Sequence, residues 1–209
     1  EYNGYKVYWE DGAQVAAPRD KEIIDLVNGI TDYSYPKTMN REAAVAAGLY
    51  HVIGEEIDDK YIAELKKLVL DWDAIKAVAD ELKIVYTPLN GSGNVPVRTV
   101  LGKAGLQNIT VVKEQEMPDG NFPTCPYPNP EIFEALRLGL ELAEKSDADL
   151  MLATDPDADR VGIAIKCPDG TYELVSGNEV GVLLLDYICA GRIENGTMPE
   201  KAVAVKSIV

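Results

Sequence analysis

Three aspartates, Asp155, Asp157 and Asp159, stand at alternate positions in one short segment. The segment joins two apolar runs, 149–153 and 161–165, which predict strands. Loops at the carboxyl ends of parallel strands are where α/β proteins place ligands. Carboxylates this close repel one another unless they share a cation. Because Mg²⁺ prefers oxygen ligands and keeps water or phosphate oxygens in its other positions, the sequence predicts a magnesium site in this loop.

Arg160 ends this segment, residues 155–160, which we call the acidic loop. A guanidinium can hold a phosphate through two hydrogen bonds, and a metal ion beside it is a recurring arrangement in phosphoryl transfer. An arbitrary Asp-x-Asp-x-Asp run is more often a solvated turn, and that alternative stays open on spacing alone. An EF-hand loop is excluded, because Arg160 replaces its glycine at the sixth position and Lys166 its glutamate at the twelfth.

Composition limits the classes of partner. The 209 residues are 46% hydrophobic and 26% charged, as in an ordinary globular protein, and their formal net charge is −15. This acidity disfavours nucleic acid and anionic membranes as partners. No apolar run approaches the roughly 18 residues that a membrane span needs. The three cysteines, Cys125, Cys167 and Cys189, are scattered and suit a reducing cytosol, so we expect a cytoplasmic protein.

Strands and helices alternate along most of the chain. The predicted strands are residues 6–9, 84–86, 109–112, 150–153 and 161–165, and the predicted helices are 20–27, a helix from 59, 73–82, 95–104 and 130–145. Asn129 and Pro130 favour the start of the last of these helices. After a turn at 168–170 we expect a strand, a helix and a strand. The alternation predicts an α/β fold, a three-layer αβα domain with a mostly parallel mixed sheet.

The acidic loop resembles the metal-binding loop of the phosphoglucomutase/phosphomannomutase superfamily, the α-D-phosphohexomutases. Residues 2–6 resemble the segment that follows the family's Thr-Ala-Ser-His-Asn-Pro serine loop, and residues 88–93 resemble its strand-to-helix glycine loop. Residues 118–123 resemble its Pro-Asp-Gly-x-Phe-Pro signature. Residues 176–179 and 205–209 resemble the opening of its third domain. Residues 8–14 are similar to bacterial phosphoglucomutases and their phosphopentomutase relatives, which favours that branch.

The resemblance implies a phosphosugar mutase. In that family a phosphoserine gives its phosphoryl group to glucose 1- or 6-phosphate, and the bisphosphate returns the other phosphate. Asp155, Asp157 and Asp159 would hold one Mg²⁺, Arg160 would bind the phosphate, and Lys6 matches a family lysine that assists proton transfer or stabilises charge. Mannose, glucosamine and ribose phosphates stay open as substrates beside glucose. A non-catalytic metal- or phosphate-binding module is the alternative of another class.

The family's Ser-His-Asn-Pro sequence does not occur in this chain. We therefore expect a fragment that is inactive alone, whose partners are the phosphosugar and the missing domains of the same chain. The expected division is 1–58 as the end of a first domain, 59–168 as the αβα domain with the acidic loop and its following strand, and 169–209 as the start of a third. In the glycine loop (88–93), backbone N–H groups could contact a phosphate, but a tight strand-to-helix turn is the first interpretation.

Overall fold

The computed structural model describes residues 6–32 and 34–206, and the chain divides into two compact units, Glu1–Ile53 and Gly54–Val209. The first unit holds two helices, α1 (Arg19–Asn28) and α2 (Arg41–Ala46). None of its described residues is buried. The core of the molecule therefore belongs to the second unit. In the described part of the chain, no helix combines the length and the apolar content that crossing a bilayer requires.

The strand predicted for residues 6–9 does not form. An isolated antiparallel bridge between Tyr8 and Gln14 stands there, closed by a turn in which Gly12 N–H donates to the Trp9 carbonyl. One bridge with no further strand beside it in the described residues is a turn rather than a sheet. Residues 2–5, which carry part of the family resemblance, lie outside the described residues.

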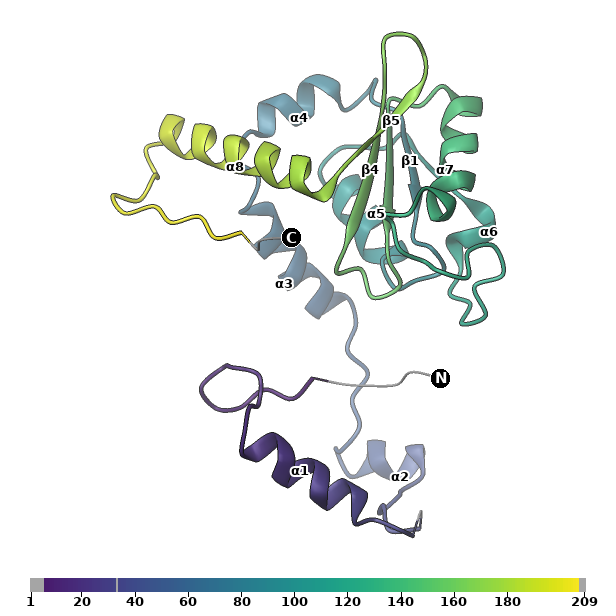
Figure 1. Cartoon of the computed structure of the whole chain (residues 1–209), viewed down its shortest axis with the longest axis vertical. Helices are drawn as coiled ribbons and strands as arrows, with labels where there is room; N and C mark the ends of the chain where they lie inside the picture. The colour runs from purple at the N-terminus through teal and green to yellow at the C-terminus, as the bar shows by residue number, and fades with distance from the viewer. Residues whose placement is uncertain (1–5, 33, 207–209) are drawn as a thin grey trace. The chain divides into compact units, whose positions relative to one another are not determined.

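The second unit is built around one five-stranded sheet in the order β2-β1-β3-β4-β5. Its elements are β1 (Ile84–Thr87), β2 (Ile109–Val111), β3 (Leu150–Thr154), β4 (Val161–Lys166) and β5 (Tyr172–Val175), with α3 (Glu55–Lys66), α4 (Trp72–Val78), α5 (Asn94–Lys103), α6 (Lys113–Glu116), α7 (Phe133–Ser146) and α8 (Gly177–Glu194). β1 pairs in parallel with β2 and β3, whereas β3–β4 and β4–β5 are antiparallel. Figure 1 shows α7 on one side of the sheet and α5 on the other. The predicted α/β fold with a mixed sheet is confirmed.

Helix α7 supplies the side chains that fill the core. Its buried residues recur at helical spacing along one face, Ala135, Leu136, Gly139, Leu140 and Ala143, and this face packs on β1 and β3. The predicted start at Pro130 is wrong by three residues. The Asn129 side chain accepts from Glu131 N–H in a turn that precedes the helix, so it caps this turn and not α7.

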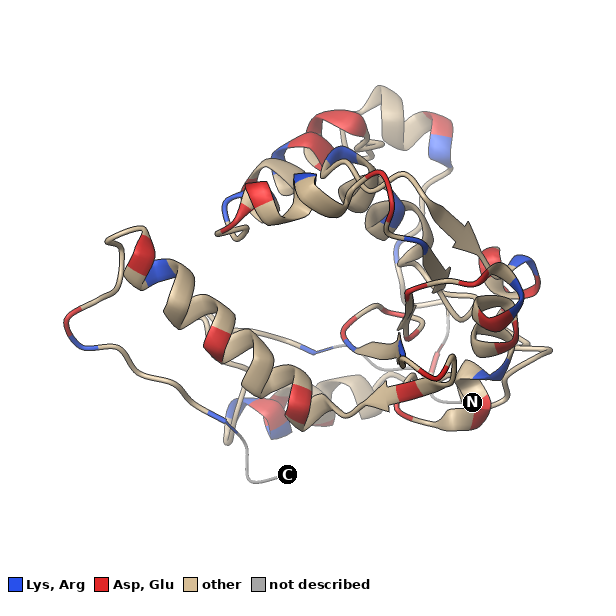
Figure 2. Ribbon diagram, turned by 90° about the horizontal axis from the view of Figure 1, so that it is seen from above, with Lys and Arg blue, Asp and Glu red and all other residues tan. Residues whose placement is uncertain are grey.

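The sheet continues past the division expected between residues 168 and 169. β5 pairs with β4 over residues 172–175, and α8 follows directly with Ser176 and Glu179 forming a reciprocal cap at its start. None of the residues of α8 is buried, although Figure 2 shows it as a mostly uncharged helix. The strand expected near the end of the chain does not form in residues 202–206, and residues 207–209 lie outside the described part.

Candidate metal and phosphate site

The acidic loop lies at the carboxyl end of β3, where it turns the chain back into β4. Thr154 is the last residue of β3, and its Oγ1 lies 2.8 Å from the hydroxyl oxygen of Tyr86 in β1. Both side chains belong to neighbouring parallel strands that end at the same edge of the sheet. The loop is therefore at the edge where an α/β sheet places ligands, as its spacing predicted.

The three aspartates of the loop converge. One carboxylate oxygen from each of Asp155, Asp157 and Asp159 lies within 4.8 Å of the others. Asp155 is buried, and the other two are exposed. The loop is tightened by two hydrogen bonds to Asp155: Arg160 N–H donates to its Oδ1 at 2.9 Å, and Ala158 N–H donates to its carbonyl at 3.0 Å.

Electrostatics make this cluster unfavourable without a cation. Burial raises the pKa of Asp155 above its ordinary value, the Arg160 N–H opposes that rise, and the neighbouring Asp157 carboxylate adds to it. A cation among the three carboxylates would reverse the balance, because it favours their ionised forms. The cluster therefore has the charge and the donor atoms of a site for a hard divalent ion.

Arg160 lies at the margin of this cluster. Its Nε is 3.9 Å from Asp155 Oδ2 and 3.9 Å from Asp159 Oδ1, the long end of an ion-pair distance, and its side chain is 54% exposed. The guanidinium can thus reach an anion that approaches the loop from solvent. Lys6, the other predicted catalytic residue, is exposed and belongs to the Glu1–Ile53 unit, so its role stays a prediction.

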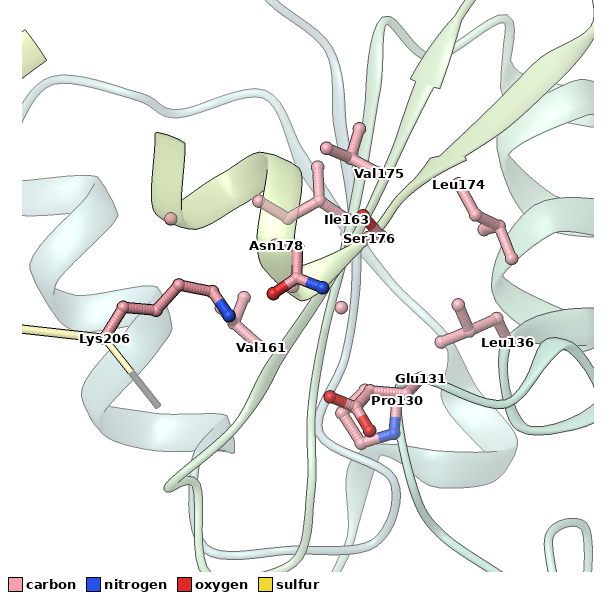
Figure 3. A pocket seen from close by; sticks show the side chains of 13 residues that line it. Pro130, Glu131, Leu136, Val161, Ile163, Leu174, Val175, Ser176, Asn178 and Lys206 are labelled. Atoms are coloured by element: carbon pink, nitrogen blue, oxygen red, sulfur yellow. The ribbon is translucent and has the colours of Figure 1, made fainter. Parts of the chain in front are cut away.

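A cavity of about 640 Å³ lies beside the strand that follows the loop. Its wall includes Val161 of β4 and the first turn of α8, and Figure 3 shows the Asn178, Glu131 and Lys206 side chains around it. Neither the aspartates nor Arg160 line this cavity. The exposed side chains of the acidic loop, Asp157, Asp159 and Arg160, face solvent beside the buried Asp155.

The structure adds supporting residues that sequence reasoning did not identify. Ser92 of the glycine loop donates to the Pro156 carbonyl through its hydroxyl, and Tyr86 contacts Thr154 just before the first aspartate. The sequence does place the glycine loop after one predicted strand and the acidic loop after another. Predicting the contact between the two loops would also have required knowing that these strands are neighbours in the sheet.

Comparison with known proteins decides the family. Residues 59–170 match the family model described as phosphoglucomutase/phosphomannomutase, alpha/beta/alpha domain II. The chain belongs to this family. The matched residues include the whole acidic loop and four of the five strands of the sheet. The resemblance inferred from the sequence motifs is confirmed.

Relatives of the phosphoglucomutase/phosphomannomutase family cover nearly all of the chain. It is 35% identical over 208 residues to the phosphoglucomutase of Staphylococcus saprophyticus, a match that covers 100% of this chain and 36% of that protein. It is 36% identical over 183 residues to the phosphopentomutase of Homo sapiens, covering 87% of this chain and 29% of that protein. The chain thus spans about a third of the length of the curated relatives that it matches.

A solved structure shows the same fold. The "putative phosphomannomutase" of Thermus thermophilus superposes with a TM-score of 0.51 and 24% identity, over 67% of this chain and 29% of that one. At this identity the likeness concerns the fold alone. The family match and the fold agree on an αβα domain that carries the acidic loop.

Proposed function

We propose that the protein to which this chain belongs is a Mg²⁺-dependent phosphosugar mutase. It interconverts a sugar 1-phosphate and a sugar 6-phosphate, or a pentose 1- and 5-phosphate, by a phosphoserine relay. The observation that carries the proposal is the convergence of three carboxylate oxygens within 4.8 Å beside Arg160, in a chain of this family. Glucose phosphate is the first candidate substrate, because two relatives matched over the whole chain are phosphoglucomutases.

The donor set fits Mg²⁺. Three carboxylate oxygens that lie within 4.8 Å of one another are the hard oxygen donors that this ion prefers, and water or phosphate oxygens would complete its shell. The buried Asp155 carboxylate, whose pKa is raised by burial, gains most from a cation. When bound, Mg²⁺ supplies charge that polarises a transferring phosphoryl group. Asp155, Asp157 and Asp159 would hold it.

The remaining roles belong to cationic side chains. The exposed Arg160 guanidinium holds and neutralises a substrate phosphate through its forked donors. Lys6 assists proton transfer or stabilises charge near the serine that the family uses. Without that serine the 209-residue chain presents no nucleophile for a covalent relay, so it is inactive alone.

The same proposal covers organisation and setting. Residues 1–58 end a first domain, 59–168 form the αβα domain and 169–209 lead into a third, with β5 extending the sheet of the αβα domain across the last boundary. The partners of this chain are a phosphosugar and the other domains of its own protein. The net charge of −15 speaks against nucleic acid and anionic membranes as partners. The scattered cysteines favour the cytoplasm.

The test is turnover in the complete protein. The product of the whole gene should convert glucose 1-phosphate to glucose 6-phosphate in the presence of Mg²⁺. Asp159→Asn, which removes one charge at nearly constant shape, should lower kcat at least roughly 100-fold, because a metal contributes several kcal/mol of transition-state stabilisation. Asp147→Asn is the matched control, since Asp147 precedes the other end of β3 and should leave kcat unchanged.

One alternative follows from the sequence itself. The alternative is a non-catalytic metal- or phosphate-binding module. Such a module would also lack the Ser-His-Asn-Pro sequence, which does not occur in this chain. The complete coding sequence separates the two proposals. A serine in that setting shortly before Glu1 supports the mutase, whereas a complete gene that lacks it removes the relay and leaves the binding module.

A further inference from the structure

Two loops from distant parts of the sequence meet at one edge of the sheet. The glycine loop, residues 88–93, follows β1, and the acidic loop follows β3. β1 and β3 are parallel neighbours with Thr87 opposite Ala153, so both loops leave the sheet side by side. From their contacts we infer that Gly91 and Ser92 are positioning residues for the metal ligands. This inference rests on the proposed metal site.

Gly91 allows the closest approach between the loops. A Cβ atom at this position would lie 2.6 Å from the Pro156 carbonyl oxygen and 2.8 Å from its carbonyl carbon, distances that no real Cβ contact tolerates. The backbone of Gly91 is not left-handed, so it is the proximity of Pro156 that requires glycine here. Because the atoms in the way are backbone atoms between two predicted ligands, Asp155 and Asp157, no side-chain rotation relieves the contact, and a larger residue pushes the glycine loop and this segment apart.

Ser92 fixes the same point of the acidic loop by hydrogen bonds. Its N–H donates to the Pro156 carbonyl oxygen at 2.8 Å, and its hydroxyl donates to the same oxygen at 3.0 Å. The ring of Pro156 restricts its φ, so a doubly held carbonyl fixes the direction of the chain on both sides of it.

The residue before the first ligand is held in a similar way. Thr154 Oγ1 pairs with the Tyr86 hydroxyl, and Gly93 leaves room for this pair, since a Cβ at Gly93 would lie 2.6 Å from Thr154 Oγ1. Asp155 is thus flanked by two anchored neighbours, Thr154 and Pro156. The two anchors therefore fix the backbone from which the Asp155 carboxylate projects.

The backbone donors of the glycine loop argue against its other interpretation, a cradle for phosphate. Asn90 N–H donates to the Gln115 carbonyl at 2.9 Å, Gly91 N–H to the Pro88 carbonyl at 2.8 Å, and Ser92 N–H to Pro156. Three successive N–H groups are therefore already used within the protein. We assign the loop to support of the acidic loop and not to anion binding.

The experiment uses the 209-residue chain and Mn²⁺ as the probe. Gly91→Ala should weaken Mn²⁺ binding at least about tenfold in a calorimetric titration, since displaced ligands lose coordination geometry. It should also shift the amide resonances of residues 157–160 in the metal-free protein. Ser92→Ala should do both to a smaller degree, and Ser92→Thr, which keeps the hydroxyl, should restore binding. The matched controls are Gly181→Ala, where a Cβ meets open space, and Ser146→Ala, which removes a hydroxyl bond to the Leu142 carbonyl; both should leave binding unchanged.

The outcomes separate this inference from the proposed function. If wild type binds Mn²⁺, Asp157→Ala does not, and both Gly91→Ala and Ser92→Ala bind like wild type with unmoved amide resonances, the inference is overturned and the metal site stands. If wild type binds no Mn²⁺, the metal site fails and the inference with it. Should Gly91→Ala fail to fold, as a thermal melt would show, the Ser92→Ala and Ser92→Thr pair decides.

Discussion

β3 is bordered by carboxylates at both ends, and their surroundings are opposite. Before its first residue, Asp147 contacts Lys166 Nζ and its Oδ2 lies 3.7 Å from Lys83 Nζ. Beyond its last residue, the acidic loop gathers three carboxylate oxygens within 4.8 Å, and the Arg160 Nε beside them is 3.9 Å from two of these aspartates. One end is neutralised by the protein itself. The other end keeps an excess of negative charge that only a bound cation would balance.

The two ends also differ in what ionisation does to stability. The Lys166 hydrogen bond holds the pKa of Asp147 below its ordinary value, so ionised Asp147 favours the folded state. Burial raises the pKa of Asp155, so ionised Asp155 disfavours it. Ionised Asp147 with its lysine partners therefore stabilises the fold, whereas ionised Asp155 destabilises it unless a cation is bound.

The largest expected effect on stability comes from a residue within β3, the strand between the lysine-paired end and the acidic loop. Met151 is fully buried against the face of α7, so Met151→Ala should lower the free energy of unfolding by about 2–5 kcal/mol. Denaturant unfolding measures this. Val161→Ala, at an exposed position of β4, is the control and should change it far less. A loss below about 1 kcal/mol for Met151→Ala would show that the two ends do not depend on a common core.

A smaller effect with the opposite sign is expected at the acidic end. At pH 7 without divalent metal, Asp155→Asn should raise the free energy of unfolding by about 1 kcal/mol, because it removes the repulsion between Asp155 and a neighbouring carboxylate. Two charges about 5 Å apart repel by about this much at an effective dielectric constant of about 60. Asparagine keeps an oxygen that can accept the Arg160 N–H. With saturating Mg²⁺, wild type should have the higher melting temperature of the two proteins, because only its intact site is stabilised by bound metal. Destabilisation in both conditions would contradict the account.

The pH dependence of the two ends should diverge. Asp155, with a raised pKa, favours folding while protonated, and this contribution is lost as pH rises through its folded pKa. Asp147, with a lowered pKa, contributes stability above its unfolded pKa and loses it as pH falls through its folded pKa. Carboxyl ¹³C NMR titration should place the Asp155 midpoint above that of an ordinary aspartate and the Asp147 midpoint below it. Equal midpoints would remove the contrast between the two ends.

The smallest effect is expected from the lysine-paired end. Asp147→Asn should lower the melting temperature slightly at pH 7, because the ion pairs of this exposed side chain are screened by water. Asparagine tolerates the left-handed backbone of this position, where φ is 54°, so the change isolates the charge. The difference between wild type and variant should shrink further in about 1 M salt. A large loss of stability at high salt would mean that Asp147 acts through something other than its charge.

Local sequence predicted the acidic loop, because its residue types, its spacing and its flanking apolar runs are all contained in one segment. It also predicted the α/β fold from the alternation of elements. Sequence alone could not show that Gly91 supports Pro156, because that contact depends on β1 and β3 being parallel neighbours. It also misjudged the start of α7, since the same Asn129–Pro130 signal serves a turn there.

Calorimetric titration of the 209-residue chain with Mg²⁺ tests the central claim, that the acidic loop is a metal site. Wild type should bind one Mg²⁺, weakly, because the phosphoserine ligand implied by the family is not part of this chain and Mg²⁺ releases its water reluctantly. Asp157→Ala should show no binding heat, and Asp147→Asn should titrate like wild type. Identical heats from wild type and Asp157→Ala would contradict the claim and remove the three aspartates as ligands.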